Sequence, residues 1–164
     1  WDRVFIILGN RDINKLRLYA ELSFDEHFES FRQKCHENEL SFLEYTQKHD
    51  LQRDQLSKLR WMLACTMGCG ENTFQTRKME LAILSGKKTT DDDVLASFKQ
   101  SIDPQGADPF MLKLLLVGQL MIVIGETLFV HAGIQEDSLG FVPGSEILFD
   151  NVPDWAAALN SWKS

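Results

Sequence analysis

Two short polar segments follow apolar stretches of the chain and contain residue types that bind metals and phosphates. The first is "VFIILGNRD", where Asn10, Arg11 and Asp12 come directly after a run of β-formers and one glycine. The second is "LFVHAGI", where His131 follows Thr127–Val130. Polar side chains at the ends of buried strands in α/β proteins commonly line a ligand crevice. An amide oxygen and an imidazole nitrogen at the ends of neighbouring strands can share one divalent metal, so the pair predicts a metal site.

Each segment also has a simpler structural interpretation. In the first, Gly9 supplies an unusual backbone angle, and Asn10 or Asp12 caps a following helix. In the second, a lone histidine at a strand end is more often structural than a ligand. The remaining histidines fall in charged helical stretches and are interpreted as solvated: His27, His36 and His49. The occurrence of both polar segments in one chain favours the metal site.

The chain between the two segments is predicted to be largely helical. Apolar residues recur there at helical spacing, for example Ile13, Leu16 and Ala20 on one face, and Leu59, Leu63 and Met67 on one stripe with Leu56. The acidic run "DDD" is explained by the favourable electrostatics of a helix start, not by metal binding. The predicted helices cover 13–22, 24–39 after a Ser23 cap, 40–49, 53–67, 73–86, 89–102 and 108–120.

The hydrophobic period then changes to that of a β-hairpin. "LMIVIGETLFV" reads as two strands around a tight Gly125–Glu126 turn, and the second strand, Thr127–Val130, is too apolar to be a surface edge. The apolar run Leu114–Gly125 is shorter than the roughly 20 residues that span a bilayer, and is therefore assigned to the core. Loop signals follow, and then a last helix carrying Trp155, Leu159 and Trp162.

Composition limits the classes of function. The chain has the length of one domain, 164 residues, and its 44% hydrophobic content suffices for a packed core. A net charge of −7 argues against general nucleic-acid binding, and no membrane partner is expected. The odd cysteine set of Cys35, Cys65 and Cys69 indicates a reducing, cytoplasmic setting. A zinc site built from these cysteines and His36 has irregular spacing, so reduced thiols are favoured.

"GNRD" after an apolar strand and "LFVHAGI" after a hairpin together resemble two sequence blocks of the calcineurin-like metallophosphoesterases. The family blocks are written GNH followed by an acid, and VHGG or VHAG; the second block most resembles those of phosphoprotein phosphatases and symmetrical diadenosine tetraphosphatases. The resemblance implies a four-layer α/β sandwich with the site on loops at the strand ends. It also implies that Asn10 and His131 bind one metal of a two-metal centre of Mn, Fe, Zn or Mg.

The chain departs from the family pattern at Arg11, where the family usually has a histidine. A guanidinium cannot act as a general acid at neutral pH, but it can hold a phosphoryl oxygen through a bidentate contact. A similar GNRD block occurs in the bacterial UDP-diacylglucosamine pyrophosphatases. Asp12 is then expected to orient Arg11 or to cap the helix, so both are candidate catalytic residues.

The spacing of the two blocks departs as well, because Asn10 and His131 are further apart than the corresponding residues of phosphoprotein phosphatases. The additional residues between the two blocks fall in the predicted helices, which we interpret as a helical insertion or cap. The resemblance covers the first twenty residues and the chain from about Leu112 onward. The expected division is a metallophosphoesterase core of residues 1–22 and 107–164 and an insertion of residues 23–106.

The family blocks Asp-x-His and Gly-Asp-x-x-Asp, which supply the other metal, are absent from the chain. "DEH" at Asp25–His27 matches the first only by letters, since it falls in a predicted helix. Because the sequence opens at Trp1 almost directly in a strand, we expect it to be the C-terminal part of a longer polypeptide.

The function expected of the intact protein is metal-dependent hydrolysis of a phosphoester, with a phosphoprotein or a small phosphoester as substrate and two divalent metals as cofactors. A serine/threonine protein phosphatase is the nearest kind. The alternative is a catalytically degenerate relative whose helical insertion binds a protein partner. A wholly helical interaction domain leaves both polar strand ends unexplained.

Overall fold

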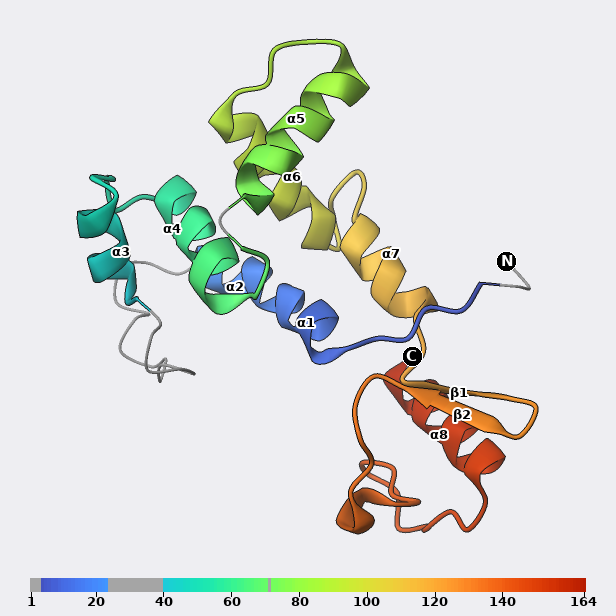
Figure 1. Ribbon diagram of the computed structural model, residues 1–164. Coiled ribbons are helices and arrows are strands. Elements are labelled where there is room, and N and C mark those ends of the chain that lie inside the picture. Colours follow the sequence, from blue (N-terminus) through green and yellow to red (C-terminus); the bar gives the residue numbers. More distant parts are fainter. Residues whose placement is uncertain (1–3, 24–39, 71) are drawn as a thin grey trace. The chain divides into compact units, whose positions relative to one another are not determined.

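The computed structural model describes residues 4–23, 40–70 and 72–164 (Figure 1). Contacts divide the chain into two compact units, which we call the hairpin unit (residues up to Ile13 with Leu112–Ser164) and the helical unit (Asn14–Met111). The described residues combine helices with one two-stranded sheet, which agrees with the α/β class in its broad sense. None of their helices has the length and apolar character needed to cross a membrane.

The sheet of the hairpin unit consists of β1 (Met121–Ile124) and β2 (Thr127–Val130). They pair antiparallel from Met121 opposite Val130 to Ile124 opposite Thr127, around a turn in which Gly125 has a φ of 61°. Glycine adopts such an angle more readily than other residues, and the strand pairing around it confirms the predicted hairpin and its turn.

The opening segment of the hairpin unit is extended but is not a full strand. Ile7 makes a single parallel bridge to Gln119, in which the Leu8 N–H donates to the Gln119 carbonyl at 2.8 Å. Leu8 is buried, whereas Val4 and Phe5 are exposed. The segment therefore delivers Gly9 and the residues after it to the start of the hairpin.

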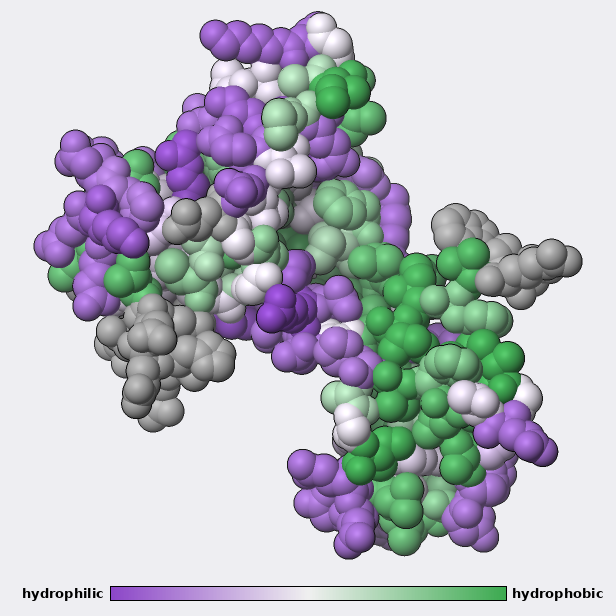
Figure 2. Space-filling view, viewed as in Figure 1, coloured by the Kyte–Doolittle hydropathy of each residue, from purple (hydrophilic) through white to green (hydrophobic). Residues whose placement is uncertain are grey.

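Two burial predictions for the hairpin unit are wrong. In β2, Leu128 and Val130 are half-buried while Thr127 and Phe129 are exposed, so the strand alternates between core and solvent and does lie at a surface. The run Leu114–Gly125 is only partly core, because several of its large hydrophobic side chains are exposed. Figure 2 shows that hydrophobic residues cover much of the visible surface of this unit. The exposed large hydrophobics of the run are Leu116, Val117 and Ile124.

Helix α8 (Val152–Lys163) packs on the hairpin as the predicted last helix. Trp155 is buried and donates its indole N–H to the Phe141 carbonyl at 2.8 Å, whereas Trp162 is exposed. The Asn160 carboxamide accepts from the Leu120 N–H and donates to the Met121 carbonyl, each at 2.8 Å. These bonds satisfy backbone groups at the start of β1 and fix the helix on the sheet.

Helix α7 (Phe110–Val117) spans the boundary of the two units, and its C-terminal end is capped within the hairpin unit. The Lys163 ammonium donates to the carbonyls of Leu115, Leu116 and Gly118. A cation at this end offsets the negative pole of the helix dipole as well as satisfying orphan carbonyls.

The helical unit contains most of the predicted helices: α2 (Arg17–Ser23), α3 (Phe42–Lys48), α4 (Gln55–Trp61), α5 (Thr73–Ser85) and α6 (Asp91–Ile102). Ser41 with Glu44 forms a capping box on α3, and Thr90 with Asp93 forms one on α6. Gly86 ends α5 in the left-handed conformation. The predicted helix 24–39, with Asp25, His27, Cys35 and His36, lies outside the described residues.

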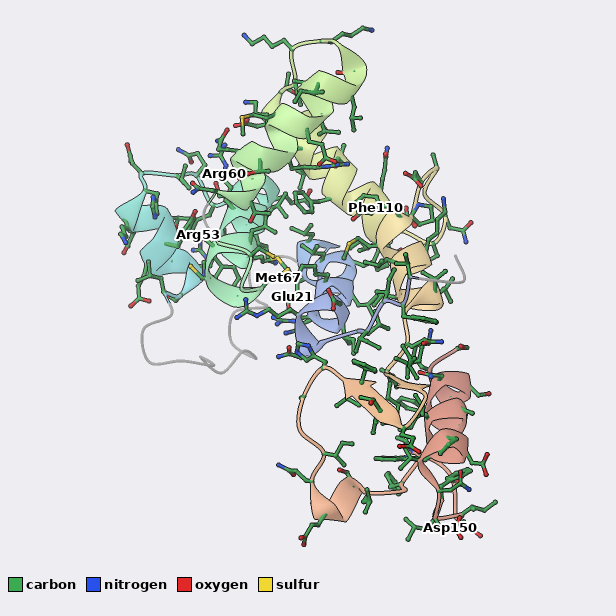
Figure 3. The ribbon with its side chains drawn as sticks, turned by 45° about the vertical axis from the view of Figure 1, so that its right-hand side comes forward. Glu21, Arg53, Arg60, Met67, Phe110 and Asp150 are labelled. Carbon is green, nitrogen blue, oxygen red and sulfur yellow. The ribbon has the colours of Figure 1, made fainter. Side chains whose placement is uncertain are left out.

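The core of this unit follows the predicted stripe of α4 and the π-helical turn after it (Met62–Thr66). Leu59, Leu63 and Met67 are almost wholly buried, and Figure 3 labels Met67 among the side chains of the unit.

The prediction of which face of the first helix is buried is wrong. A 3₁₀ turn at Asn14–Leu16 separates α1 (Asn10–Ile13) from α2, Ile13 and Leu16 are exposed, and Leu18 and Leu22 are buried instead.

A charged network joins three helices of the unit at Asp91. The Asp91 carboxylate accepts from Arg60 of α4, labelled in Figure 3, and from Lys78 of α5, and the Arg60 guanidinium lies 4.6 Å from the centre of the Phe74 ring. The Lys78 hydrogen bond, helped by the nearby charge of Arg60, lowers the pKa of Asp91 below its ordinary value, against the opposing effect of burial. Asp91 therefore favours its charged form in the folded chain.

Asp91→Asn is expected to lower the free energy of unfolding by about 1 kcal/mol at pH 7, as for a partly exposed ion-pair network. Because the folded-state pKa is lowered, this contribution is present above the unfolded pKa of about 3.9 and is lost as pH falls through the folded pKa. Urea unfolding of both proteins between pH 7 and pH 2 measures it. The matched control is Asp92→Asn, one exposed residue along the same helix. A difference between wild type and Asp91→Asn that persisted at the lowest pH would contradict this origin.

Candidate functional site

Asn10 and His131, the two predicted metal ligands, meet in the hairpin unit although 121 positions separate them. Their side chains are exposed, and His131 Nε2 lies 3.1 Å from Asn10 Oδ1. The imidazole nitrogen and the amide oxygen are therefore within hydrogen-bond distance of each other. The ends of the opening segment and of β2 are thus brought to one place.

The His131 imidazole ring lies close against the backbone at Gly9, the residue before Asn10. Gly9 is buried, and a Cβ on it would lie 2.6 Å from His131 Cε1 and Nδ1. The backbone angle at Gly9 is not among the positive φ values of the chain, so the expectation that it supplies an unusual angle is wrong. Gly9 is required because there is no room for a side chain.

Asp12 fixes the turn that presents Asn10. It is the third residue of α1, and its Oδ2 accepts a hydrogen bond from the Gly9 N–H at 2.8 Å. An acid at this position that reaches back to the residue before the helix is one half of a capping box. The capping interpretation of Asp12 is therefore confirmed, and its carboxylate holds Gly9 under the His131 ring.

Arg11 lies between these two residues in α1 and is exposed. Its position next to Asn10 puts the guanidinium on the same short turn as the predicted metal ligand. With five N–H donors in a planar fork and a permanent positive charge, it suits an anion with two adjacent oxygens. Its role as a phosphate-binding residue stays a prediction.

The donor pair fits part of a metal coordination shell. Two ligands at right angles on one ion, each about 2.1 Å from it, lie about 3.0 Å apart, and the Asn10 and His131 donors are separated by 3.1 Å. An amide oxygen suits Mg or Mn, and an imidazole nitrogen suits Zn or Fe. Within the described ranges no group of three or more His, Cys, Asp or Glu residues could hold a metal, and the metal-ligand role of Asn10 and His131 stays a prediction.

The cysteine site considered from the sequence has only two of its members among the described residues. Cys65 and Cys69 are half-buried and form no disulfide among the described residues, and the Cys69 thiol donates to the Met67 carbonyl at 3.6 Å. Sequence reasoning missed the role of Gly9, since a glycine before a helix is equally consistent with a special backbone angle. Only the distance to the His131 ring distinguishes the two.

Comparisons of the chain with protein-family models, curated proteins and solved structures found no match. The case for any function therefore depends on the two sequence blocks and on the geometry that joins them.

Proposed function

We propose that the full-length protein is a metal-dependent phosphoester hydrolase of the calcineurin-like metallophosphoesterase kind, nearest to the serine/threonine protein phosphatases. The observation that carries the proposal is the 3.1 Å contact of Asn10 Oδ1 and His131 Nε2, which joins two family-like blocks across 121 positions. In this proposal residues 1–22 and 107–164 belong to a four-layer sandwich core, and residues 23–106 form a helical insertion.

Each residue of the candidate site has a defined task in this proposal. Asn10 would present its amide oxygen to the metal, and His131 would present Nε2, which lies 3.1 Å from that oxygen. Two bound divalent ions supply Lewis-acid chemistry to the phosphoryl group. Arg11 holds phosphoryl oxygens and stabilises the charge that develops on them. Asp12 keeps Gly9, and therefore Asn10, in position.

The proposed substrate is a phosphoprotein or a small phosphoester, and manganese is the first metal to test. The cysteine content supports a reducing, cytoplasmic compartment. A protein partner on the helical insertion belongs to the alternative in which the metal centre is degenerate.

The first test measures binding of Mn²⁺ to the full-length protein. The electron paramagnetic resonance signal of free Mn²⁺ is the readout. His131→Ala and Asn10→Ala are each expected to weaken Mn²⁺ binding by about tenfold or more, because each removes one of few ligands. His49→Ala is the matched control, since His49 is an exposed histidine after α3 in the helical unit. Equal affinities in the wild type and in both site variants would contradict the metal site.

The second test is turnover of p-nitrophenyl phosphate and of a phosphopeptide by the product of the full open reading frame. Hydrolysis that depends on Mn²⁺, Asn10 and His131 is expected. Mn²⁺ binding without hydrolysis of either substrate would overturn the hydrolase assignment and favour the degenerate binding module.

A further inference from the structure

A stretch of the hairpin unit combines exposed apolar side chains with unbalanced negative charge. Between His131 and Lys163 the sequence contains no lysine, arginine or histidine and five acids: Glu136, Asp137, Glu146, Asp150 and Asp154. The same stretch exposes large apolar side chains, which we call the loop patch: Leu139 (57% exposed), Phe141 (48%), Ile147 (67%) and Leu148 (70%).

The loop that carries the patch is held by specific contacts. The Phe149 N–H donates to the Gly140 carbonyl at 2.9 Å, which ties the two ends of the loop together. Gly140 is buried with a φ of 76°, and a Cβ there would lie 2.3 Å from the Phe149 carbonyl oxygen. Val142 is buried, and Trp155 donates to the Phe141 carbonyl. The apolar side chains are therefore displayed by an anchored loop.

These contacts also bring the patch residues together. Leu139 and Phe141 flank Gly140, and Leu148 precedes Phe149, so the Gly140–Phe149 bond sets the two apolar segments side by side. Asp150 follows directly, and Figure 3 labels it at the end of the loop that leads into α8. Contiguous exposed apolar side chains on a soluble domain commonly mark an interaction site.

We propose that the loop patch docks a short basic amphipathic segment of a partner protein, with leucine or phenylalanine on the patch and lysine or arginine against the Glu146 and Asp150 carboxylates beside it. Charge selects this occupant. A second copy of the chain would bring the same uncompensated acids, and each copy has a net charge of −7. A cationic segment instead meets opposite charge, which raises the association rate and favours it over acidic competitors. The inference does not depend on the hydrolase proposal.

The experiment measures binding of a fluorescent peptide of leucine and lysine, patterned as an amphipathic helix, by anisotropy. Two matched peptides replace every leucine with serine or every lysine with glutamate. The chain and the product of the full open reading frame are expected to bind only the first peptide, more weakly at 0.5 M than at 0.05 M salt because added salt screens exposed charges.

Variants locate the binding surface. Ile147→Ser with Leu148→Ser is expected to weaken binding about tenfold or more, as for central apolar contacts. Glu146→Gln with Asp150→Asn is expected to weaken it about fivefold through lost charge. The matched apolar control is Ile83→Ser with Leu84→Ser in α5, where both side chains are at least as exposed. Asp92→Asn is the charge control.

Three outcomes overturn the proposal. One is equal loss of binding in the loop and α5 variants, which indicates nonspecific adhesion. Another is a dimer, seen by sedimentation, that the Ile147 and Leu148 substitutions dissociate, because the occupant is then a second copy. The third is binding by the chain but not by the product of the full open reading frame, because the patch is then covered by the protein itself. All substituted side chains are exposed, so circular dichroism is expected to show an unchanged fold.

Discussion

Gly9→Ala is expected to lower kcat/KM for the proposed phosphoester hydrolysis by the full-length protein by about a hundredfold, since displacing a reacting group by about 1 Å can cost that much. The added Cβ would stand 2.6 Å from Cε1 and Nδ1 of His131 and 2.8 Å from Cγ. Carbon atoms in van der Waals contact lie about 3.5–4.0 Å apart. Either the imidazole ring or the turn at Gly9 must therefore move by about that same 1 Å.

Both movements damage the same contact. If the ring moves, His131 Nε2 leaves Asn10 Oδ1, and if the turn moves, Asn10 is carried away with the backbone of α1. The Asp12 carboxylate opposes the second movement, because it holds the Gly9 N–H at 2.8 Å. We therefore expect the ring to be displaced while α1 stays folded.

Gly133→Ala provides a matched control two residues after His131. A Cβ there has no heavy atom within 4 Å, and the φ of Gly133 is not positive. Kinetics are measured alongside the ¹H–¹³C resonance of His131 Cε1, which reports ring position without any turnover. A shifted resonance with unchanged kinetics would refute the hydrolase role of His131, and an unshifted resonance would refute the steric argument itself.

The parts of the fold that the sequence predicted well are those with local causes. The capping pair Thr90 with Asp93 fixes where α6 begins, and Gly86 fixes where α5 ends, whereas the Ser41 cap that starts α3 was not predicted. These depend on hydrogen bonds and backbone angles within a few residues. The hairpin at Gly125 is predictable for the same reason.

The predictions that failed concern burial, which depends on what packs against an element. Ile13 and Leu16 fit a helical stripe, but the 3₁₀ turn between α1 and α2 rotates them to the surface and turns Leu18 and Leu22 inward. Phe129 fits a buried strand, but β2 has the single partner β1 in the described sheet and exposes every second residue. The hydrophobic period alone does not reveal how many other elements pack against a helix or a strand.

The candidate site is intermediate between these cases. The sequence supplied Asn10, Arg11, Asp12 and His131 through a resemblance, and the geometry shows that Asn10 and His131 lie at bonding distance. The sequence did not reveal that the His131 ring, 122 positions away along the chain, leaves no room for a side chain at Gly9. No local pattern encodes a close approach between distant segments.

Arg11→Lys is expected to lower kcat/KM by about thirtyfold, equivalent to about 2 kcal/mol of transition-state stabilisation, as when one oxyanion donor is removed. The substitution keeps the positive charge and loses the planar fork that holds two phosphoryl oxygens at once. Binding of Mn²⁺ should stay unchanged, because the predicted ligands are Asn10 and His131. Arg53→Lys, at an exposed arginine of the helical unit, is the control.

A second variant separates the chemistry of the guanidinium from its effect on the fold. Arg11→Ala should lose more activity than Arg11→Lys, and added guanidinium ion should restore part of it, because the free cation can occupy the vacated position with the same donor geometry. Asp12 is already engaged by the Gly9 N–H, so α1 should keep its cap in both variants. Unchanged kinetics with metal retained would exclude the phosphate clamp and leave Arg11 a role in local charge balance. Loss of Mn²⁺ in Arg11→Lys would instead show that the substitution disturbs Asn10, and that the division of tasks along this turn is different from the one proposed.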